Sequence, residues 1–296
     1  MYRLDGQMTL SVGTTVRRAA EQGAELVTEI PEGTVVELVA RQSGWTLIAW
    51  PNGTGGVLIG WVVLPPSAAA RAREGGKIHG VVRLTGEAPI MKVPRKMKDA
   101  EWCRDHPTPY NAVLSRDGKL KDVFIRIENG GVKGHFPSPP VPAAFEQVNC
   151  MYSPRIQGVM VGQQIEVRNG DETLHVVHSF KGKESWFSQA QPKGTGAVTR
   201  EATSAGFFKL TCDVHPWMRA FVVVTDHPFF AVTGDDGSFS IEGVPPGEYN
   251  VEAWHSHYGL KKASVTVGRG ERALDFTYDG TEPAPDINRD ELKDLF

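Results

Sequence analysis

The chain has few cysteines, almost no net charge and no long apolar run. Its 296 residues include three cysteines, which permit at most one internal disulfide and leave one thiol over. Basic and acidic residues nearly balance, at 32 and 35, so charge provides no general attraction to nucleic acid. No apolar run approaches the roughly 18 residues of a membrane span. We therefore expect neither a nucleic-acid partner nor a membrane span.

Catalytic and targeting motifs are also missing. The sequence has no Gly-x-Ser-x-Gly elbow, no His-Glu-x-x-His pair and no phosphate-binding loop, so we expect that the protein is not a hydrolase or a nucleotide-dependent enzyme. The N-terminus, MYRLDGQMTLSVGTTVRRAAEQ, lacks the apolar stretch of a secretory signal.

Glycine and proline are frequent, with 32 and 20 residues, and no stretch predicts a helix of three turns. Short runs that are rich in β-forming residues lie between Gly, Pro, Asn and Asp loops. This punctuation predicts an all-β protein built of sandwiches and a small barrel. The first predicted strand after the linker lies in GKIHGVVRLTGEAP, with apolar residues at positions 78, 82 and 84, and the others are 122–130, 163–170, 175–180, 206–212 and 220–226.

The N-terminal region alternates apolar and polar residues, with turns expected at 31–33 and 43–44. Its pattern IPEGTVVELV…SGWTLI…GVLIGWVVL, with Gly-Trp pairs at 44–45 and 60–61, resembles the bacterial SH3-like family. The resemblance implies a docking module over residues 1–65, without catalysis, for a peptide or cell-wall ligand. Most of its tryptophans are expected to pack in the core. A Pro- and Gly-containing linker follows at 66–76.

The C-terminal stretch GDDGSFSIEGVPPGEYNVEAW resembles the carboxypeptidase regulatory-like, transthyretin-like sandwich, whose mark is Gly-x-Phe-x-Ile-x-x-Val-Pro-Pro-Gly-x-Tyr. The resemblance implies a structural or adhesive domain over 228–279. Residues 77–95 look like its first strand, so we expect the central domain to be inserted between the two parts. The last residues, 280–296, are predicted to be a tail with one helical turn.

The segment TCDVHPWM, residues 211–218, places thiolate, imidazole and thioether close together, and these are the soft or borderline metal ligands of proteins. The alternative is a loop with a buried cysteine and a methionine that fills a gap. A metal site would need another histidine from a neighbouring strand. His175 and His178 lie on opposite faces of one predicted strand, and we choose His175, at the strand start.

Two motifs, AGFFKLTCDVHPWMRAFVVV and RNGDETLHVVH, resemble the cupredoxins, blue copper proteins of the amicyanin and plastocyanin type. The resemblance implies a Greek-key copper domain over 96–227. It also implies one mononuclear type 1 copper, with the ligands His175, Cys212, His215 and an axial Met218. The expected function is single-electron transfer with a redox protein such as a c-type cytochrome. Such a ligand set compromises between the geometries that Cu(I) and Cu(II) prefer, whereas zinc seldom takes a thioether.

Other copper proteins fit the sequence less well. A multicopper oxidase would need histidines on both sides of its cysteine, but Thr211 and Asp213 flank Cys212. A binuclear centre would need a second cysteine in the loop. Two further alternatives stay open: a copper carrier or sensor, and a structural surface protein that no longer binds metal. The sequence also departs from relatives that place asparagine directly after the first histidine, since Val176 is found here, which puts the rigidity of the site in question.

The remaining cysteines, Cys103 and Cys150, lie outside the ligand set and are either buried thiols or a disulfide, which we favour. A disulfide indicates an oxidising compartment. Because blue copper proteins normally work outside the cytoplasm, we expect a periplasmic or extracellular location and an export signal that was removed or misassigned.

We also expect the ring edge of His215 to reach the surface beside Pro216 and Trp217, where an apolar collar would meet the partner. His178 is expected to face away from the ligand loop.

The other histidines carry weaker predictions. His227 is a candidate to support the site, and His255 with His257 is expected at the surface. The histidines at positions 79, 106 and 135 are expected to be ordinary exposed residues.

Overall fold

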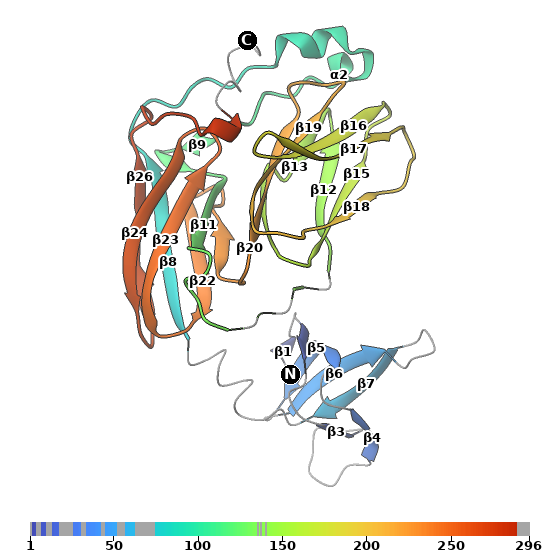
Figure 1. Cartoon of the computed structure of the whole chain (residues 1–296), viewed down its shortest axis with the longest axis vertical. Helices are drawn as coiled ribbons and strands as arrows, with labels where there is room; N and C mark the ends of the chain where they lie inside the picture. The colour runs from blue at the N-terminus through green and yellow to red at the C-terminus, as the bar shows by residue number, and fades with distance from the viewer. Residues whose placement is uncertain are drawn as a thin grey trace. The chain divides into compact units, whose positions relative to one another are not determined.

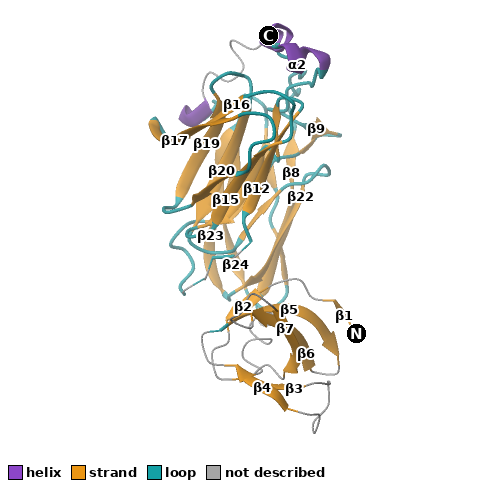
Figure 2. Ribbon diagram, turned by 90° about the vertical axis from the view of Figure 1, so that its right-hand side faces the viewer, coloured by secondary structure: helices purple, strands orange, loops and turns teal. Residues whose placement is uncertain are grey.

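The structure, a computed structural model, forms two compact units, residues 1–74 and 75–296, and each is described by itself. The all-β prediction is confirmed, since strands dominate both units and the helices are single short turns (Figures 1 and 2). The described residues are 2–3, 7–9, 14–17, 26–30, 34–42, 45–51, 57–62, 75–134, 136, 138–139 and 141–288.

The N-terminal unit contains one antiparallel sheet in the order β1-β5-β6-β7-β3-β4, with β2 also paired to β5. Its strands are β1 (Tyr2–Arg3), β2 (Gln7–Thr9), β3 (Thr14–Arg17), β4 (Leu26–Ile30), β5 (Val35–Gln42), β6 (Trp45–Pro51) and β7 (Val57–Val62). Trp50 is buried with Val16 and Ile48, so it packs in the core and does not line a groove. The turns expected at 31–33 and 43–44 lie outside the described residues.

The second unit contains four sheets. Two of them, β22-β8-β10-β9 with β25 and β26 also on β8, and β21-β11-β23-β24, form its C-terminal sandwich. The strands are β8 (Gly76–Leu84), β9 (Ser115–Arg116), β10 (Lys119–Leu120), β11 (Val123–Ile127), β21 (Phe230–Val232), β22 (Ser238–Val244), β23 (Gly247–His255), β24 (Gly259–Val267), β25 (Glu271–Ala273) and β26 (Phe276–Tyr278). The chain enters this sandwich at β8, leaves it after β11 and returns at β21.

The other two sheets, β13-β12-β15-β18 and β14-β20-β19-β16-β17, form the central sandwich. The strands are β12 (Ala143–Val148), β13 (Met151–Ser153), β14 (Ile156–Met160), β15 (Gln164–Asn169), β16 (His175–Lys181), β17 (Glu184–Gln191), β18 (Val198–Glu201), β19 (Gly206–Cys212) and β20 (Arg219–Thr225). On β12 and β16, alternate side chains are buried, as expected for strands with one face on a core.

Strand β20 is buried on both faces, which explains its unbroken apolar sequence. Val222 and Val224 pack in the large core of the unit. Phe221 and Val223 instead join Phe124 and Trp254 of the C-terminal sandwich in a separate cluster. Figure 1 shows β20 between the two sets of strands, so this strand joins the sandwiches into one unit.

The strand pairing differs from one boundary expected from the sequence. The predicted copper domain, 96–227, includes β11, but β11 pairs with β21 and β23 of the C-terminal sandwich. The physical reason is that all five residues of β11 are buried, so the strand needs cover on both faces. Val123, Ile125 and Ile127 lie in the large core, whereas Phe124 lies in the cluster with Phe221 and Val223 of β20.

A short helical segment precedes β9. It consists of the 3-10 helix η1 (Arg95–Asp99) and the α-helix α2 (Glu101–Asp105). A second 3-10 helix, η2 (Asp286–Asn288), lies near the C-terminus. The expected disulfide is present: Cys103 of α2 is bonded to Cys150, between β12 and β13. The disulfide therefore joins the helical segment between β8 and β9 to the central sandwich.

Candidate metal centre

Three of the four predicted ligands lie together at one end of the central sandwich. The Sγ of Cys212 is 3.7 Å from Nδ1 of His175 and 3.7 Å from Nδ1 of His215. The two Nδ1 atoms are 2.9 Å apart. These separations have the size expected when ligands contact one ion at about 2.0–2.3 Å. The structure therefore brings one thiol and two imidazoles close enough together to bind a single metal ion.

Strand pairing explains why distant residues meet here. His175 is the first residue of β16 and Cys212 is the last residue of β19, and these strands are antiparallel neighbours with Val177 opposite Cys212. The start of β16 and the end of β19 therefore lie at the same end of the sheet. His215 follows in the loop before β20. All three side chains are buried, with exposed fractions of 0%, 2% and 5% in chain order.

The surroundings of Cys212 favour its thiolate. Burial alone would raise the pKa of the thiol, but hydrogen bonds from His175, His215 and the amide of Val176 outweigh it and lower the pKa to about 6. The Val176 amide donates to Sγ at 3.3 Å. A thiolate is the form of cysteine that binds metal.

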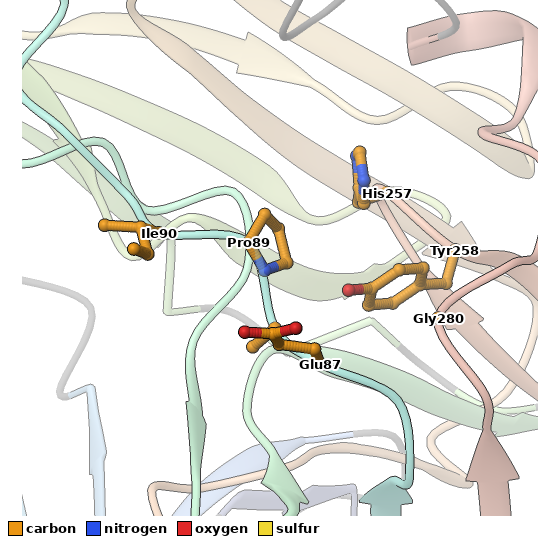
Figure 3. A pocket seen from close by; sticks show the side chains of 7 residues that line it. Glu87, Pro89, Ile90, His257, Tyr258 and Gly280 are labelled. Atoms are coloured by element: carbon orange, nitrogen blue, oxygen red, sulfur yellow. The ribbon is translucent and has the colours of Figure 1, made fainter.

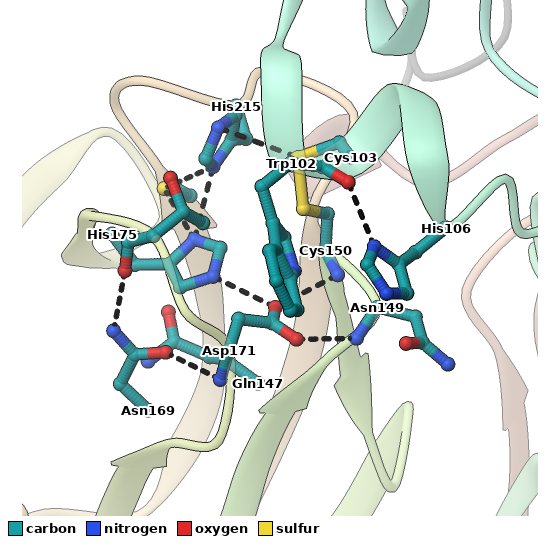
Figure 4. Close-up of polar contacts among 12 residues, drawn as sticks. Trp102, Cys103, His106, Gln147, Asn149, Cys150, Asn169, Asp171, His175 and His215 are labelled. Carbon is teal, nitrogen blue, oxygen red and sulfur yellow. Dashed lines mark hydrogen bonds and ion pairs between the residues drawn. A yellow bond between two sulfur atoms is a disulfide. The ribbon is translucent and has the colours of Figure 1, made fainter. Parts of the chain in front are cut away.

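Asp171 orients the first histidine. The Nε2 of His175 donates to the buried Oδ2 of Asp171 at 2.9 Å, which leaves Nδ1 directed at Cys212 (Figure 4). The same carboxylate accepts the amide hydrogens of Asn149 and Cys150, at 2.7 and 2.8 Å. Although burial raises the pKa of Asp171, the bonds from His175 and from both amides lower it overall. Asp171 is not among the residues predicted from the sequence, where its one signal is its position four residues before His175.

The ligand loop is tied to β16 without the asparagine that relatives place after the first histidine. The amide of Asp213 donates to the carbonyl oxygen of Val176 at 3.0 Å. A side-chain contact adds to this tie, because Nδ1 of His178 lies 2.9 Å from Oδ1 of Asp213. The expectation that His178 faces away from the ligand loop is therefore wrong, because its ring reaches Asp213, the first residue after β19.

The outer edge of His215 is covered. Its Nε2 lies 3.6 Å from Sγ of Cys103 in the disulfide, and Figure 4 shows the disulfide beside the ring. Trp217 is only 2% exposed, and its Nε1 donates to the carbonyl oxygen of Cys150 at 2.9 Å. The expectation of an exposed His215 edge flanked by a surface Trp217 is therefore wrong, because α2 and the disulfide occupy that side.

Met218 lies at the end of the ligand loop and is fully buried. Its amide donates to the carbonyl oxygen of His215 at 2.9 Å, which closes a tight turn. The axial role of the thioether stays a prediction.

The remaining histidines lie away from this group. His227 is buried and bonds through Nε2 to the carbonyl oxygen of Ile127, so it supports a loop and not the predicted ligands. His255 is also buried, at 1% exposure, which contradicts the expected surface position. The reason is that its ring packs against the buried rings of Tyr258 and Tyr278, with centroids 5.0 and 6.3 Å away. His79 and His106 are half-buried, and the position of His135 lies outside the described residues.

A cavity of about 360 Å³ lies in the second unit, lined by residues that include Glu87, Ile90 and Tyr258 (Figure 3). His257 contributes to the lining, but His175, Cys212 and His215 do not. The cavity is therefore separate from the candidate metal centre.

Solved cupredoxin structures resemble part of the chain. The purple cupredoxin from Nitrosopumilus maritimus is 23% identical and the match covers 28% of this chain and 99% of that protein, with a TM-score of 0.26. A mutant of amicyanin in the Cu(I) state is 26% identical over 28% of this chain and 81% of its own, with a TM-score of 0.25. A pseudoazurin is 17% identical, with a TM-score of 0.25. The similarity is confined to a minor part of the chain and carries no argument about function.

A family model described as "BOS complex subunit NOMO1-like, second beta sandwich domain" matches residues 227–276, within the C-terminal sandwich. Comparison with curated proteins gave no match. Within the described residues, no helix has the length and apolar character that crossing a membrane requires.

Proposed function

We propose that the chain binds one copper ion through His175, Cys212 and His215, with Met218 as the axial ligand, and carries single electrons between redox proteins. The observation that supports it most is the convergence of two Nδ1 atoms and one Sγ within 3.7 Å, from two strand ends and a loop. One thiolate with two imidazoles and a weak thioether is the donor set of electron-transfer copper sites. Zinc would accept the first three ligands but seldom a thioether.

Copper, when bound, supplies a one-electron couple, and the residues of the chain supply the rest. Asp171 fixes the ring of His175 and its tautomer. The Val176 amide hydrogen-bonds the Cys212 sulfur. Burial of all three ligands keeps bulk water away, so little rearrangement is needed when the charge of the centre changes.

The partner surface is proposed around the residues that precede the two histidine ligands. Leu174 and Val214 are apolar side chains that are 43% and 44% exposed, and each directly precedes a histidine ligand in the sequence. They replace the Pro216-Trp217 collar expected from the sequence. A c-type cytochrome that docks here would cover an apolar surface close to both histidines.

Stopped-flow oxidation of the Cu(I) protein by a c-type cytochrome tests this role. Val214→Glu should leave the copper content and colour nearly unchanged but slow the protein partner about tenfold, because a charge must lose water on docking. Val161→Glu is the matched control, since Val161 is 38% exposed and its amide bonds to Thr225, at the far end of β20. Small inorganic oxidants should react with all three proteins at similar rates. Equal cytochrome rates for Val214→Glu and wild type would contradict the proposed surface.

Two other roles would give different results. A copper carrier or sensor would bind copper but would exchange electrons slowly with every protein partner. A structural protein would bind no copper, and the NOMO1-like match to the C-terminal sandwich is the observation that favours it. Copper affinity and cytochrome kinetics together separate the three roles.

We also propose roles for the flanking domains and a location. The N-terminal unit would act as an SH3-like docking module for a peptide or a cell-wall component, and the C-terminal sandwich as a structural domain of the carboxypeptidase regulatory-like kind. The Cys103–Cys150 disulfide supports an oxidising compartment, the periplasm or the cell exterior.

A further inference from the structure

We propose that Cys103, Cys150 and His215 form a second metal site, which is present when the disulfide is reduced and binds a soft cation such as Cu(I). The two sulfur atoms and a ring nitrogen of His215 all lie within 4.8 Å of one another, and the three side chains are buried (Figure 4). Two thiolates and one imidazole are a soft donor set. The site goes beyond the proposed copper centre and shares one residue with it.

His215 faces both groups with different atoms. Its Nδ1 points to Cys212 and His175, at 3.7 and 2.9 Å. Its Nε2 lies on the other side of the ring, 3.6 Å from Sγ of Cys103. Among the described residues, that sulfur is the only hydrogen-bond partner of Nε2, and a disulfide sulfur is a weak acceptor. The nitrogen is therefore aimed at the two cysteines without a competing oxygen ligand.

The backbone of Cys150 is held in place independently of the disulfide. Its amide donates to Asp171 at 2.8 Å, and its carbonyl oxygen accepts from Trp217 at 2.9 Å. Cys103 is held by α2, in which the amide of Arg104 donates to Ala100 at 2.8 Å. The two Cα atoms are 5.7 Å apart, so both side chains can turn toward one cation without a large backbone movement.

Reduction creates the thiol ligands. A dithiol supplies two electrons and two protons and becomes a disulfide itself, while the bond between Cys103 and Cys150 breaks and each sulfur receives one electron and one proton. The two thiol protons leave for solvent when the cation binds. When both nitrogens of His215 bind metal, the remaining ring proton also leaves for solvent, because a neutral imidazole has only one nitrogen free to accept a metal. The oxidised protein would thus have one metal site and the reduced protein two.

Cadmium titration in a Cys212→Ser background tests the proposal without the proposed copper centre, so the two can fail separately. A water-soluble phosphine reduces the disulfide, taking oxygen from water to become its oxide, and is removed under anaerobic conditions. Cd(II) is then added while thiolate-to-cadmium absorption and native mass are recorded. We expect one bound Cd(II) in reduced Cys212→Ser and none in the oxidised form. The triple variant that also carries Cys103→Ser and Cys150→Ser should bind none after the same treatment.

A pair of histidine variants tests whether His215 is a ligand, or whether the two cysteines bind cadmium without it. In reduced Cys212→Ser, His215→Ala should weaken cadmium binding at least about tenfold, in keeping with the loss of one ligand. His106→Ala is the matched control, because His106 is close to Cys103 in sequence but bonds to the carbonyl oxygen of Trp102, and it should have little effect. Three results would each overturn the proposal: a disulfide that resists the phosphine in the folded protein, no cadmium uptake after reduction, or equal affinities for the two histidine variants.

Discussion

The second unit contains two histidine pairs with different roles: His175 and His215 are both buried, whereas in the other pair His255 is buried and His257 is half-buried. His175 and His215 direct their Nδ1 atoms at each other and at a cysteine. His255 uses Nδ1 to accept the amide hydrogens of His257 and Tyr258, at 3.2 and 3.3 Å. Among the described residues, the clusters of metal-ligating atoms include neither His255 nor His257. A His-x-His spacing at the end of a strand therefore says less about metal binding than the meeting of two strand ends.

The difference lies in what surrounds each ring. A carboxylate, Asp171, holds the distal nitrogen of His175 at 2.9 Å. The Nε2 of His255 is buried and has no hydrogen-bond partner within the part of the chain that the structure describes, and the ring stacks on Tyr258 with centroids 5.0 Å apart. The first environment orients a ligand, whereas the second packs an aromatic ring into a core.

The largest effect is expected at the covered side of the candidate centre. Trp217 is 2% exposed and anchors the carbonyl oxygen of Cys150, so Trp217→Ala should lower the free energy of unfolding by about 3–5 kcal/mol. Denaturant titration measures the change. Trp186→Ala is the control, because Trp186 is only half-buried and lies on β17, and it should lose less. Equal losses, or less than about 1 kcal/mol at Trp217, would show that this side is not packed as described.

The next effect concerns the partner of the first histidine. Asp171→Asn keeps the size of the side chain but removes the charge that fixes the His175 ring, and it should weaken metal binding about 10- to 100-fold. Competition with a chelator of known affinity measures this. Asp226→Asn removes a carboxylate that bonds to Gly130 and should change metal affinity by less than about twofold. An unchanged metal affinity in Asp171→Asn would contradict the claim that a carboxylate orients His175 as a ligand, and the difference from His255 would then have no such cause.

The smallest effect is a pH dependence at His255. Burial lowers the pKa of His255 well below its ordinary value of 6.5, with a smaller contribution from Arg155. The unfolded chain therefore binds a proton below pH 6.5 that the folded protein does not, so stability falls as pH drops through that range, by at most about 1.4 kcal/mol per pH unit.

His255→Asn provides the test, because its Oδ1 can still accept the two amide hydrogens but cannot titrate. Denaturant titrations at several pH values between 6.5 and 5 should show a shallower fall for the variant than for wild type. Identical slopes would mean that His255 does not enter the pH dependence.

Much of the fold follows from local pattern. Alternation and turn residues place strands close to β8, β15, β16 and β19, and the buried valine run marks β20. Local pattern could not show that β11 belongs with β23, because a mostly apolar strand whose residues are all buried fits any sheet that is covered on both faces.

The candidate site divides in the same way. His175, Cys212 and His215 could be chosen from spacing and resemblance, since the chemistry of each side chain is evident from the sequence. The cover over His215 could not, because Cys103 is over a hundred residues away and reaches the ring through a disulfide. Long-range contacts of this kind leave no periodic signal.

Addition of Cu(II) to the metal-free protein, followed by visible and EPR spectroscopy, tests the central claim most directly. Wild type should bind one equivalent with intense thiolate-to-copper charge transfer, and Cys212→Ser should lose that absorption entirely, whereas His255→Asn should keep it. A weak tetragonal spectrum that is the same in wild type and Cys212→Ser would contradict the assignment of the copper centre.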